Sequence, residues 1–177
     1  SLHQRAYRQE TGDAPLKEHI ASAMLMRSGW TENTDAPLVD LMCGSGTIAI
    51  EAAYIARNIA PGIKRVYWGF TKWLGHEAKV WDELVEHAIS AQKPSCSGIY
   101  AGDFSRKMVA IAKANADFAG VFNDISFSQQ DATKSSPPVS TPGYVVSNPP
   151  YGERLGELTS LIPLFSDWGK RFKEAWK

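Results

Sequence analysis

The chain has 177 residues, a length that fits one domain with a core of its own. Its 19 basic and 19 acidic residues cancel, whereas a domain that holds nucleic acid by itself is usually clearly basic. Neither the two cysteines, Cys43 and Cys96, nor the four histidines follow a metal-ligand spacing, so no metal site is predicted. No stretch reads as a membrane span or signal peptide, and a reducing, cytoplasmic location is expected.

Apolar spacing and turn residues predict helices and strands that alternate along most of the chain. The first helix is expected to have Asp13 as its N-cap, Pro15 in its first turn and Gly29 as its stop. In chain order, the predicted elements are a helix over 13–29, a strand over 37–44, helices over 45–62 and 76–92, a strand over 98–103, a helix over 104–120, strands over 125–131 and 144–150, and a helix over 161–177.

This alternation predicts an α/β fold, in which helices flank a parallel sheet. Ligands of such sheets bind at the carboxyl ends of the strands, so we take the residues that follow each strand as candidates for the site. The six tryptophans mostly lie at helical spacing and are therefore predicted to be core residues rather than a platform for stacking bases.

The first candidate is the stretch "DLMCGSGT", in which a strand runs through glycines into a helix. Glycines let the backbone approach a ligand closely, and the helix N-terminus offers free N–H groups. A dinucleotide fingerprint would need a third glycine, which is absent here. The pattern acidic-x-x-x-Gly-x-Gly-Thr, which begins at Asp40, instead resembles motif I of S-adenosylmethionine methyltransferases. The candidate cofactor residues are Asp40, Cys43, Gly44, Ser45, Gly46 and Thr47.

Two further carboxylates end the next two strands. Asp103 follows the second strand, where a carboxylate can accept hydrogen bonds from both hydroxyls of a ribose. Asp131 ends the third strand and would meet the adenine amino group if the chain is a methyltransferase. Lys17 and Glu18, at the start of the first helix, are interpreted as helix-end charges.

The fourth strand runs into "SNPPYGERLG", residues 147–156. An amino group on a base or an amide is a poor nucleophile because its lone pair is delocalised, and an enzyme can help by accepting hydrogen bonds from both N–H groups. The side chain of Asn148 and the carbonyl of Pro149 are two such acceptors, and Pro149 and Pro150 hold them rigidly. Tyr151 offers a ring on which a planar base can stack. These four residues are the predicted catalytic group.

The three stretches "SLHQRAYRQETGDAPLKEHIA", "DLMCGSGTIAIEAA" and "SNPPYGERL" together resemble the THUMP-domain-linked rRNA guanine-N2 methyltransferases, and most closely their bacterial members acting on 23S rRNA. The resemblance covers nearly the whole chain. It implies a Rossmann-like class I fold, S-adenosylmethionine as methyl donor, and transfer to the N2 of a guanine. This chain differs from the family pattern at two positions: Ser105 stands where relatives often have Asp, and Ala6 stands where they often have Gly.

The resemblance also implies a domain organisation. Residues 1–35 would be a lead-in and helix, and 36–177 the Rossmann-like core. The chain is expected to be a fragment, with an RNA-gripping THUMP domain before Ser1 and the last strands of the sheet after Lys177. That division would explain the near-zero net charge, because most of the grip on 23S rRNA would lie outside the chain.

Other functions fit part of the pattern. The Asn-Pro-Pro-Tyr sequence suits an adenine N6 amino group in DNA or RNA equally well, and a protein glutamine amide is also planar. A nicotinamide-dependent oxidoreductase is disfavoured by the missing third glycine. A binding module without activity is disfavoured because all four motifs are intact.

Overall fold

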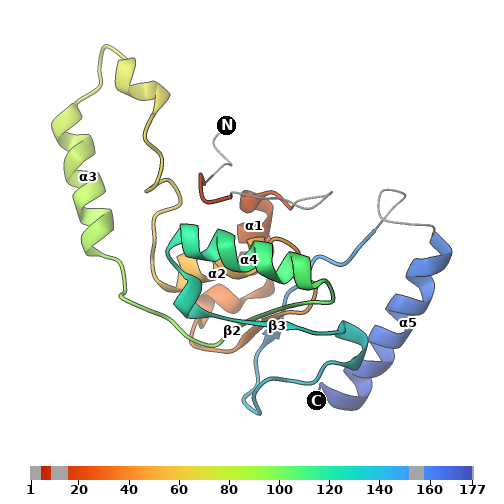
Figure 1. The fold of residues 1–177 in the computed structure, drawn as a ribbon. Helices are drawn as coiled ribbons and strands as arrows, with labels where there is room; N and C mark the ends of the chain where they lie inside the picture. Colours follow the sequence, from red (N-terminus) through yellow and green to blue (C-terminus); the bar gives the residue numbers. More distant parts are fainter. Residues whose placement is uncertain (1–4, 9–15, 152–157, 177) are drawn as a thin grey trace.

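The structure is a computed structural model, in which residues 5–8, 16–151 and 158–176 are described (Figure 1). Its regular elements follow the predicted order. They are α1 (Glu18–Ser28), β1 (Leu38–Asp40), α2 (Thr47–Ala56), α3 (Ala78–Ser90), β2 (Ile99–Asp103), α4 (Arg106–Ala119), β3 (Ile125–Gln129), β4 (Tyr144–Val145) and α5 (Leu158–Ala175). The described residues include no helix with the length and apolar character of a membrane span.

The four strands form one parallel sheet in the order β3-β2-β1-β4, as the alternation of strands and helices predicted. In register, Leu38 pairs with Ile99 on one side and with Tyr144 on the other. The chain therefore moves outward from β1 to β3 and then returns to the other side of β1. Such a reversal opens a crevice at the carboxyl ends of the strands, which is where α/β proteins bind ligands.

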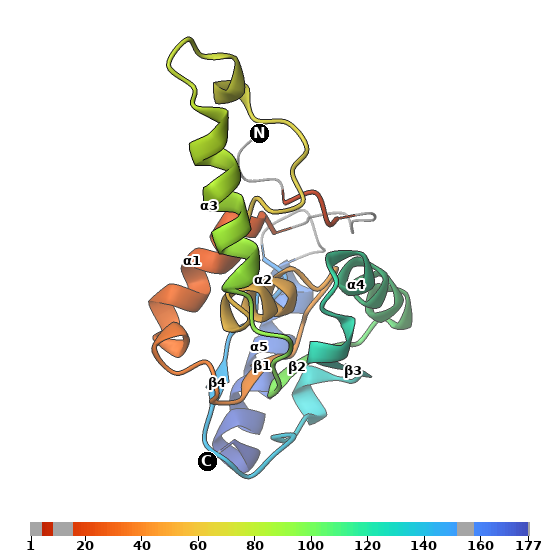
Figure 2. The same ribbon diagram turned by 90° about the vertical axis from the view of Figure 1, so that its left-hand side faces the viewer.

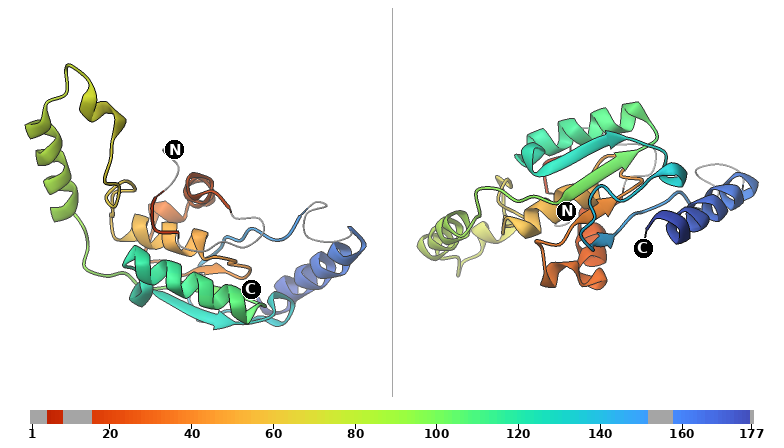
Figure 3. Two further views of the ribbon diagram at one scale, coloured as in Figure 1. Left: turned by 45° about the horizontal axis from the view of Figure 1, so that its top comes forward. Right: turned by 90° about the horizontal axis from the view of Figure 1, so that it is seen from below.

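Helices cover both faces of this sheet, and β1 shows why. Successive side chains of a strand point to opposite faces. Leu38 joins the large core with residues of α1, α2 and α4, whereas Val39 and the following Leu41 join a second cluster with aromatic side chains of α5. Figure 3 shows α5 on the opposite side of the sheet from α2 and α4.

The predicted start of the first helix is wrong. α1 begins at Glu18 with Lys17 at its N-cap, although Gly29 ends it as predicted, in the left-handed conformation at φ 82°. The start is delayed because the carbonyl of Leu16 accepts a hydrogen bond from Arg8, at 2.6 Å, which ties this backbone to the N-terminal segment. Asp13 and Pro15 lie outside the described residues.

The prediction that tryptophans are mainly core residues also fails in one region. Trp30 is fully buried, but Trp73 is 74% exposed. Trp73 belongs to a segment that we call the arm, residues 60–93, which connects α2 to β2. The helix predicted over 76–92 is present as α3, yet none of its residues is buried. Figures 1 and 2 show α3 standing away from the sheet.

Candidate cofactor and catalytic site

The glycine turn after β1 has the conformation that its sequence predicts. Gly44 and Gly46 have φ values of 53° and 86°, a region that residues with a Cβ rarely adopt. The turn is fastened to the next strand, because Cys43 N–H donates to the carbonyl of Gly102 at 2.8 Å. A Cβ on Gly46 would lie 3.0 Å from the Cβ of Ala112, so this glycine also lets α4 approach.

Asp103 lies directly beside this turn. Its Oδ2 accepts a hydrogen bond from Gly44 N–H at 2.9 Å, and its Oδ1 accepts one from Ser105 N–H at 2.9 Å. Each carboxylate oxygen can accept a further hydrogen bond. Ser105, where relatives often have Asp, caps α4 by accepting from Met108 N–H at 3.3 Å. The structure thus brings together the two motifs that the sequence separates by 59 residues.

Asp40 joins β1 to the segment after β4. Ser147 Oγ donates to Asp40 Oδ1 at 2.7 Å, and the same Oγ accepts from Leu41 N–H at 2.8 Å. Asp40 is only 2% exposed. Desolvation by this burial raises its pKa from 3.8 to about 7, against the lowering effects of the hydrogen bonds from Ser147 and Met42. A buried acidic side chain with a strongly shifted pKa is typical of a functional site.

The pKa of Asp40 predicts a pH dependence of stability. Because the folded state holds its proton up to about pH 7 and the unfolded state releases it near 3.8, stability falls as pH rises between these values and is then constant. Asp40→Asn keeps an acceptor for Ser147 and removes this pH-dependent loss of the free energy of unfolding, which is at most about 4 kcal/mol. Urea unfolding at pH 5 and pH 8 is expected to show a smaller difference for the variant. Equal differences in the two proteins would contradict the assignment.

The predicted catalytic residues follow Ser147 at the carboxyl edge of the sheet. Asn148, Pro149 and Pro150 are half-buried, and Tyr151 is 66% exposed. The Ser147–Asp40 hydrogen bond fixes the start of this loop next to β1, whose own exit is the glycine turn. The rest of the predicted motif, residues 152–156, lies outside the described residues.

Two further predicted cofactor residues, Asp131 and Cys43, have surroundings that restrict their chemistry. Asp131 Oδ1 accepts from Thr133 N–H at 2.9 Å and from Thr133 Oγ1 at 2.6 Å, and these bonds lower its pKa. Its side chain therefore caps a short turn after β3, and its other oxygen, Oδ2, lies 3.6 Å from Lys134 Nζ. Cys43 is buried, and burial raises the pKa of its thiol well above the usual range, so it is no thiolate nucleophile.

Ser45 and Thr47, the other predicted members of the turn, are both buried. The carbonyl of Ser45 accepts from Asn115 Nδ2 at 3.0 Å, which links the turn to α4. Thr47 Oγ1 accepts from Arg8 Nη2 at 3.0 Å. The backbone carbonyl of Ser45 and the side chain of Thr47 thus hold the turn in place from the protein side.

Arg8 is a residue of this site to which sequence reasoning gave no role. Besides Thr47, its Nη2 donates to the carbonyl of Leu16, and its Nε lies 3.4 Å from Glu18 Oε1. One guanidinium thereby connects the beginnings of α1 and α2 just behind the glycine turn. Only the fixed pattern at the start of the chain, "SLHQRAYR", signalled that this segment matters.

Glu51, one turn further along α2, anchors the same segment. It is 2% exposed and accepts from Tyr7 Oη at 3.0 Å and from Ser22 Oγ at 2.5 Å, while Arg5 Nη2 lies 3.4 Å away. Between Arg5 and Tyr7, Ala6 has φ 65°, a conformation that glycine adopts without strain.

The residues present fit an adenosine-type cofactor. The Asp103 oxygens are held by backbone N–H groups and keep lone pairs for ribose hydroxyls. A Cβ built on Gly44 meets no atom within 4 Å, so the turn is open on that side. Among the described residues, no group of three or more His, Cys, Asp or Glu side chains is arranged to hold a metal ion.

The strand order, the glycine turn after β1 and the acidic residue after β2 define a Rossmann-like class I S-adenosylmethionine-dependent methyltransferase fold. The chain belongs to the family described as RMKL-like methyltransferase domain, whose model matches residues 5–177. This confirms the family resemblance inferred from the sequence.

Individual relatives agree. The chain is 94% identical, over its whole length, to 26% of the ribosomal RNA large subunit methyltransferase K/L of Alteromonas mediterranea. It thus spans about a quarter of that protein. The structure of SMU.472, a putative methyltransferase complexed with SAH, is similar over 98% of this chain and 44% of the SMU.472 chain, at 34% identity and a TM-score of 0.88. A predicted N6-adenine-specific DNA methylase from Listeria monocytogenes matches 98% of the chain with 45% of its own, at 36% identity and a TM-score of 0.83.

Proposed function

We propose that this chain is the catalytic domain of a longer enzyme that methylates the exocyclic N2 of a guanine in 23S rRNA, with S-adenosylmethionine as donor. The observation that carries the proposal is the hydrogen bond from Ser147 to Asp40, which joins the loop Asn148–Tyr151 to the strand that ends in the glycine turn. A loop built to hold a planar amino group thereby lies at the edge of the sheet where the donor binds.

Gly44, Ser45 and Gly46 would form the backbone surface against which the donor lies, with Asp103 accepting its ribose hydroxyls and Asp131 its adenine amino group. Asp40, Cys43 and Thr47 support this surface from the protein side. S-adenosylmethionine supplies an electrophilic methyl group. The chain needs only to bind and orient the acceptor, and effective orientation accounts for most of the acceleration.

Asn148 Oδ1 and the carbonyl of Pro149 would accept the two N–H groups of the target amine, so that its lone pair faces the methyl group. Pro150 keeps the loop rigid, and the exposed ring of Tyr151 would stack on the base once it has left its helix. A strong general base is unnecessary, because the amine proton becomes acidic only as the new bond forms.

The remaining parts of the enzyme would lie outside this chain. We assign residues 1–35 to a lead-in and 36–177 to the catalytic core, and propose that a THUMP domain precedes them and further strands follow. The match to only 26% of a relative is consistent with further parts of the enzyme outside this chain. The zero net charge of the chain is consistent with a grip on RNA that is supplied mainly by another domain.

Methylation of adenine N6 is the second candidate. The Listeria relative is described as a predicted N6-adenine-specific DNA methylase, and an adenine amino group meets the same two acceptors. Methylation of a protein glutamine fits the loop for the same reason. The methylated product therefore decides between the candidates.

The test uses the full-length enzyme, in-vitro transcribed 23S rRNA without modifications, and isotopically labelled S-adenosylmethionine. After digestion to nucleosides, mass spectrometry is expected to find the label in N2-methylguanosine. Label in N6-methyladenosine would overturn the guanine assignment in favour of the second candidate. The same RNA already methylated by the enzyme serves as control and should take up no further label.

The contacts of Arg8 predict an effect on donor affinity. Arg8→Ala removes a charged donor from Thr47 and Leu16, and is expected to weaken binding of S-adenosylhomocysteine about tenfold in calorimetric titration. Arg8→Lys should recover only part of this, since an ammonium does not reproduce the planar fork. Arg5→Ala is the matched control, because it removes a cation from buried Glu51 without touching the turn. Equal weakening by both Ala variants would mean a general loss of structure.

A further inference from the structure

The arm is a large structure that the sheet does not require. Its two ends, after α2 and before β2, lie at the amino edge of the sheet, where a short loop would connect them. α3 is an amphipathic helix of 13 residues, yet the core buries none of them. Figures 1 and 2 show the arm projecting from the rest of the chain.

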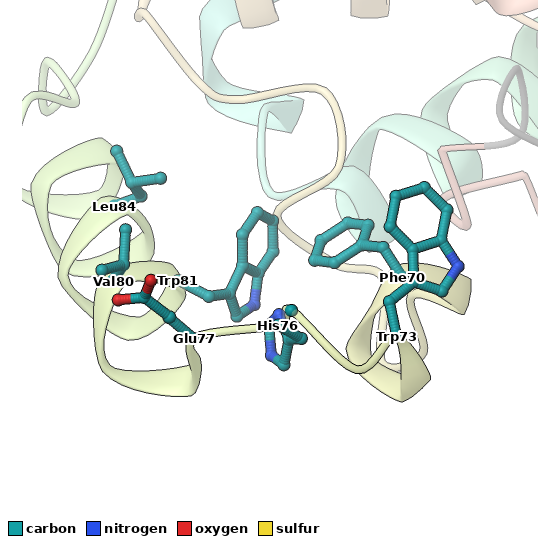
Figure 4. Close-up of a pocket in the computed structure, with 8 residues that line it drawn as sticks. Phe70, Trp73, His76, Glu77, Val80, Trp81 and Leu84 are labelled. Atoms are coloured by element: carbon teal, nitrogen blue, oxygen red, sulfur yellow. The ribbon is translucent and has the colours of Figure 1, made fainter.

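The arm holds itself together with aromatic rings. Trp81 of α3 packs edge-on against Phe70 and Trp68, with ring centroids 4.8 and 5.4 Å apart, and Phe70 lies 5.6 Å from His76. A pocket of about 430 Å³ opens beside these rings, with Trp73 at its side and the carboxylate of Glu77 among its lining groups (Figure 4). Its volume lies in the range of pockets that hold small planar ligands.

The charge of the arm is unevenly distributed. Residues 52–76 contain no Asp or Glu, although acidic and basic residues are equal in number in the chain as a whole. Lys64, Arg65 and Lys72 follow one another along this run. The Arg65 guanidinium lies 4.9 Å from the centroid of the Trp68 ring, and the Lys72 ammonium 5.7 Å from that of Tyr67. Cations and aromatic rings are therefore interspersed on one limb of the arm, residues 61–76, where the Lys64 ammonium also contacts the carbonyl and the ring of Phe118 in α4.

We propose that this limb is a docking surface for single-stranded RNA, and that the aromatic pocket receives one of its unpaired bases. Cations follow a phosphate backbone, and every base can stack on an aromatic ring such as exposed Tyr67 or Trp73. Val66 and Leu74 are fully exposed too and would suit a protein partner, but an acid-free basic run favours a polyanion. The inference rests on the proposed function, because it presumes an RNA substrate.

The position of the limb defines what it contributes. It is attached at the amino edge of the sheet, whereas Asn148 and Tyr151 follow β4 at the carboxyl edge. RNA bound by the limb is therefore RNA that flanks the target nucleotide. The limb supplies affinity and register for the substrate and takes no part in methyl transfer.

The test measures binding of unmodified, in-vitro transcribed 23S rRNA to the full-length enzyme at several salt concentrations. The triple variant Lys64→Gln/Arg65→Gln/Lys72→Gln is expected to raise the Kd for RNA about tenfold and to reduce the slope of log K against log salt by about 2, at roughly 0.7 for each lost contact. Trp73→Ala should raise the Kd about tenfold without changing the slope. In both variants KM for RNA rises, while kcat and the affinity for S-adenosylhomocysteine stay as in wild type.

The control variant Lys107→Gln/Lys113→Gln/Lys173→Gln removes the same charge from exposed positions of α4 and α5, and should change the slope less. The inference is overturned if wild type binds and methylates RNA but the limb variants do so with the same Kd and slope. It is also overturned if they bind RNA normally but alter sedimentation of the enzyme, which identifies a protein interface. Failure of wild type itself to bind or methylate rRNA contradicts the proposed function instead.

Discussion

Asn148→Ala is expected to lower kcat of the full-length enzyme about 10³-fold on unmodified 23S rRNA. The loss of one preorganised polar group that acts on the reacting atom typically has an effect of this order. The substitution removes one of the two acceptors for the target amine, while Pro149 keeps its carbonyl. Single-turnover measurements of methyl transfer, with the donor and the RNA both saturating, isolate this step.

Binding of the donor separates this effect from damage to the fold. Asn148 follows Ser147, whose Oγ is anchored to Asp40 and Leu41. The side chain of Asn148 takes no part in these hydrogen bonds. The Kd for S-adenosylhomocysteine should therefore be unchanged. Asn33→Ala, at an exposed asparagine before β1, serves as control and should leave both quantities at wild-type values. If Asn148→Ala retains turnover within tenfold of wild type, the proposed role of the loop is wrong.

Much of the fold could be predicted because it rests on local signals. Strands ending in glycine or aspartate, and helices stopped by Gly29 and Gly120, determined the order of the elements, and their alternation predicted a parallel sheet. The location of the candidate site at the carboxyl edge followed from topology alone. The start of α1 was missed because a tertiary contact, from Arg8 to Leu16, replaces the expected helical turn.

Contacts across the sequence could not be predicted in the same way. The bonds of Arg8 to Thr47 and of Ser147 to Asp40 span 39 and 107 residues, and residue types alone do not reveal such pairs. The arm was misjudged for a different reason. Helical spacing of apolar residues such as Trp81 indicates a face that needs a partner, but it does not say whether that partner is the core of the same domain.

Asp103→Ala is expected to weaken binding of S-adenosylhomocysteine by about 100-fold or more. The carboxylate is the proposed acceptor for the ribose, and hydrogen bonds to a charged group contribute about 1.5–3 kcal/mol each. The substitution also leaves Gly44 N–H without its partner, which loosens the glycine turn itself. Calorimetric titration of wild type and variant measures both the affinity and the binding enthalpy.

Asp117→Ala provides a matched control, since this aspartate is exposed near the end of α4, away from the turn. It should bind S-adenosylhomocysteine like wild type. Undiminished binding by a folded Asp103→Ala variant would mean that the donor does not lie against the turn between β1 and α2. The same carboxylate accepts hydrogen bonds from both Gly44 N–H and Ser105 N–H, and so ties the turn after β1 to the end of β2. A site made in this way depends on Asp103 for its shape as well as for its hydrogen bonds.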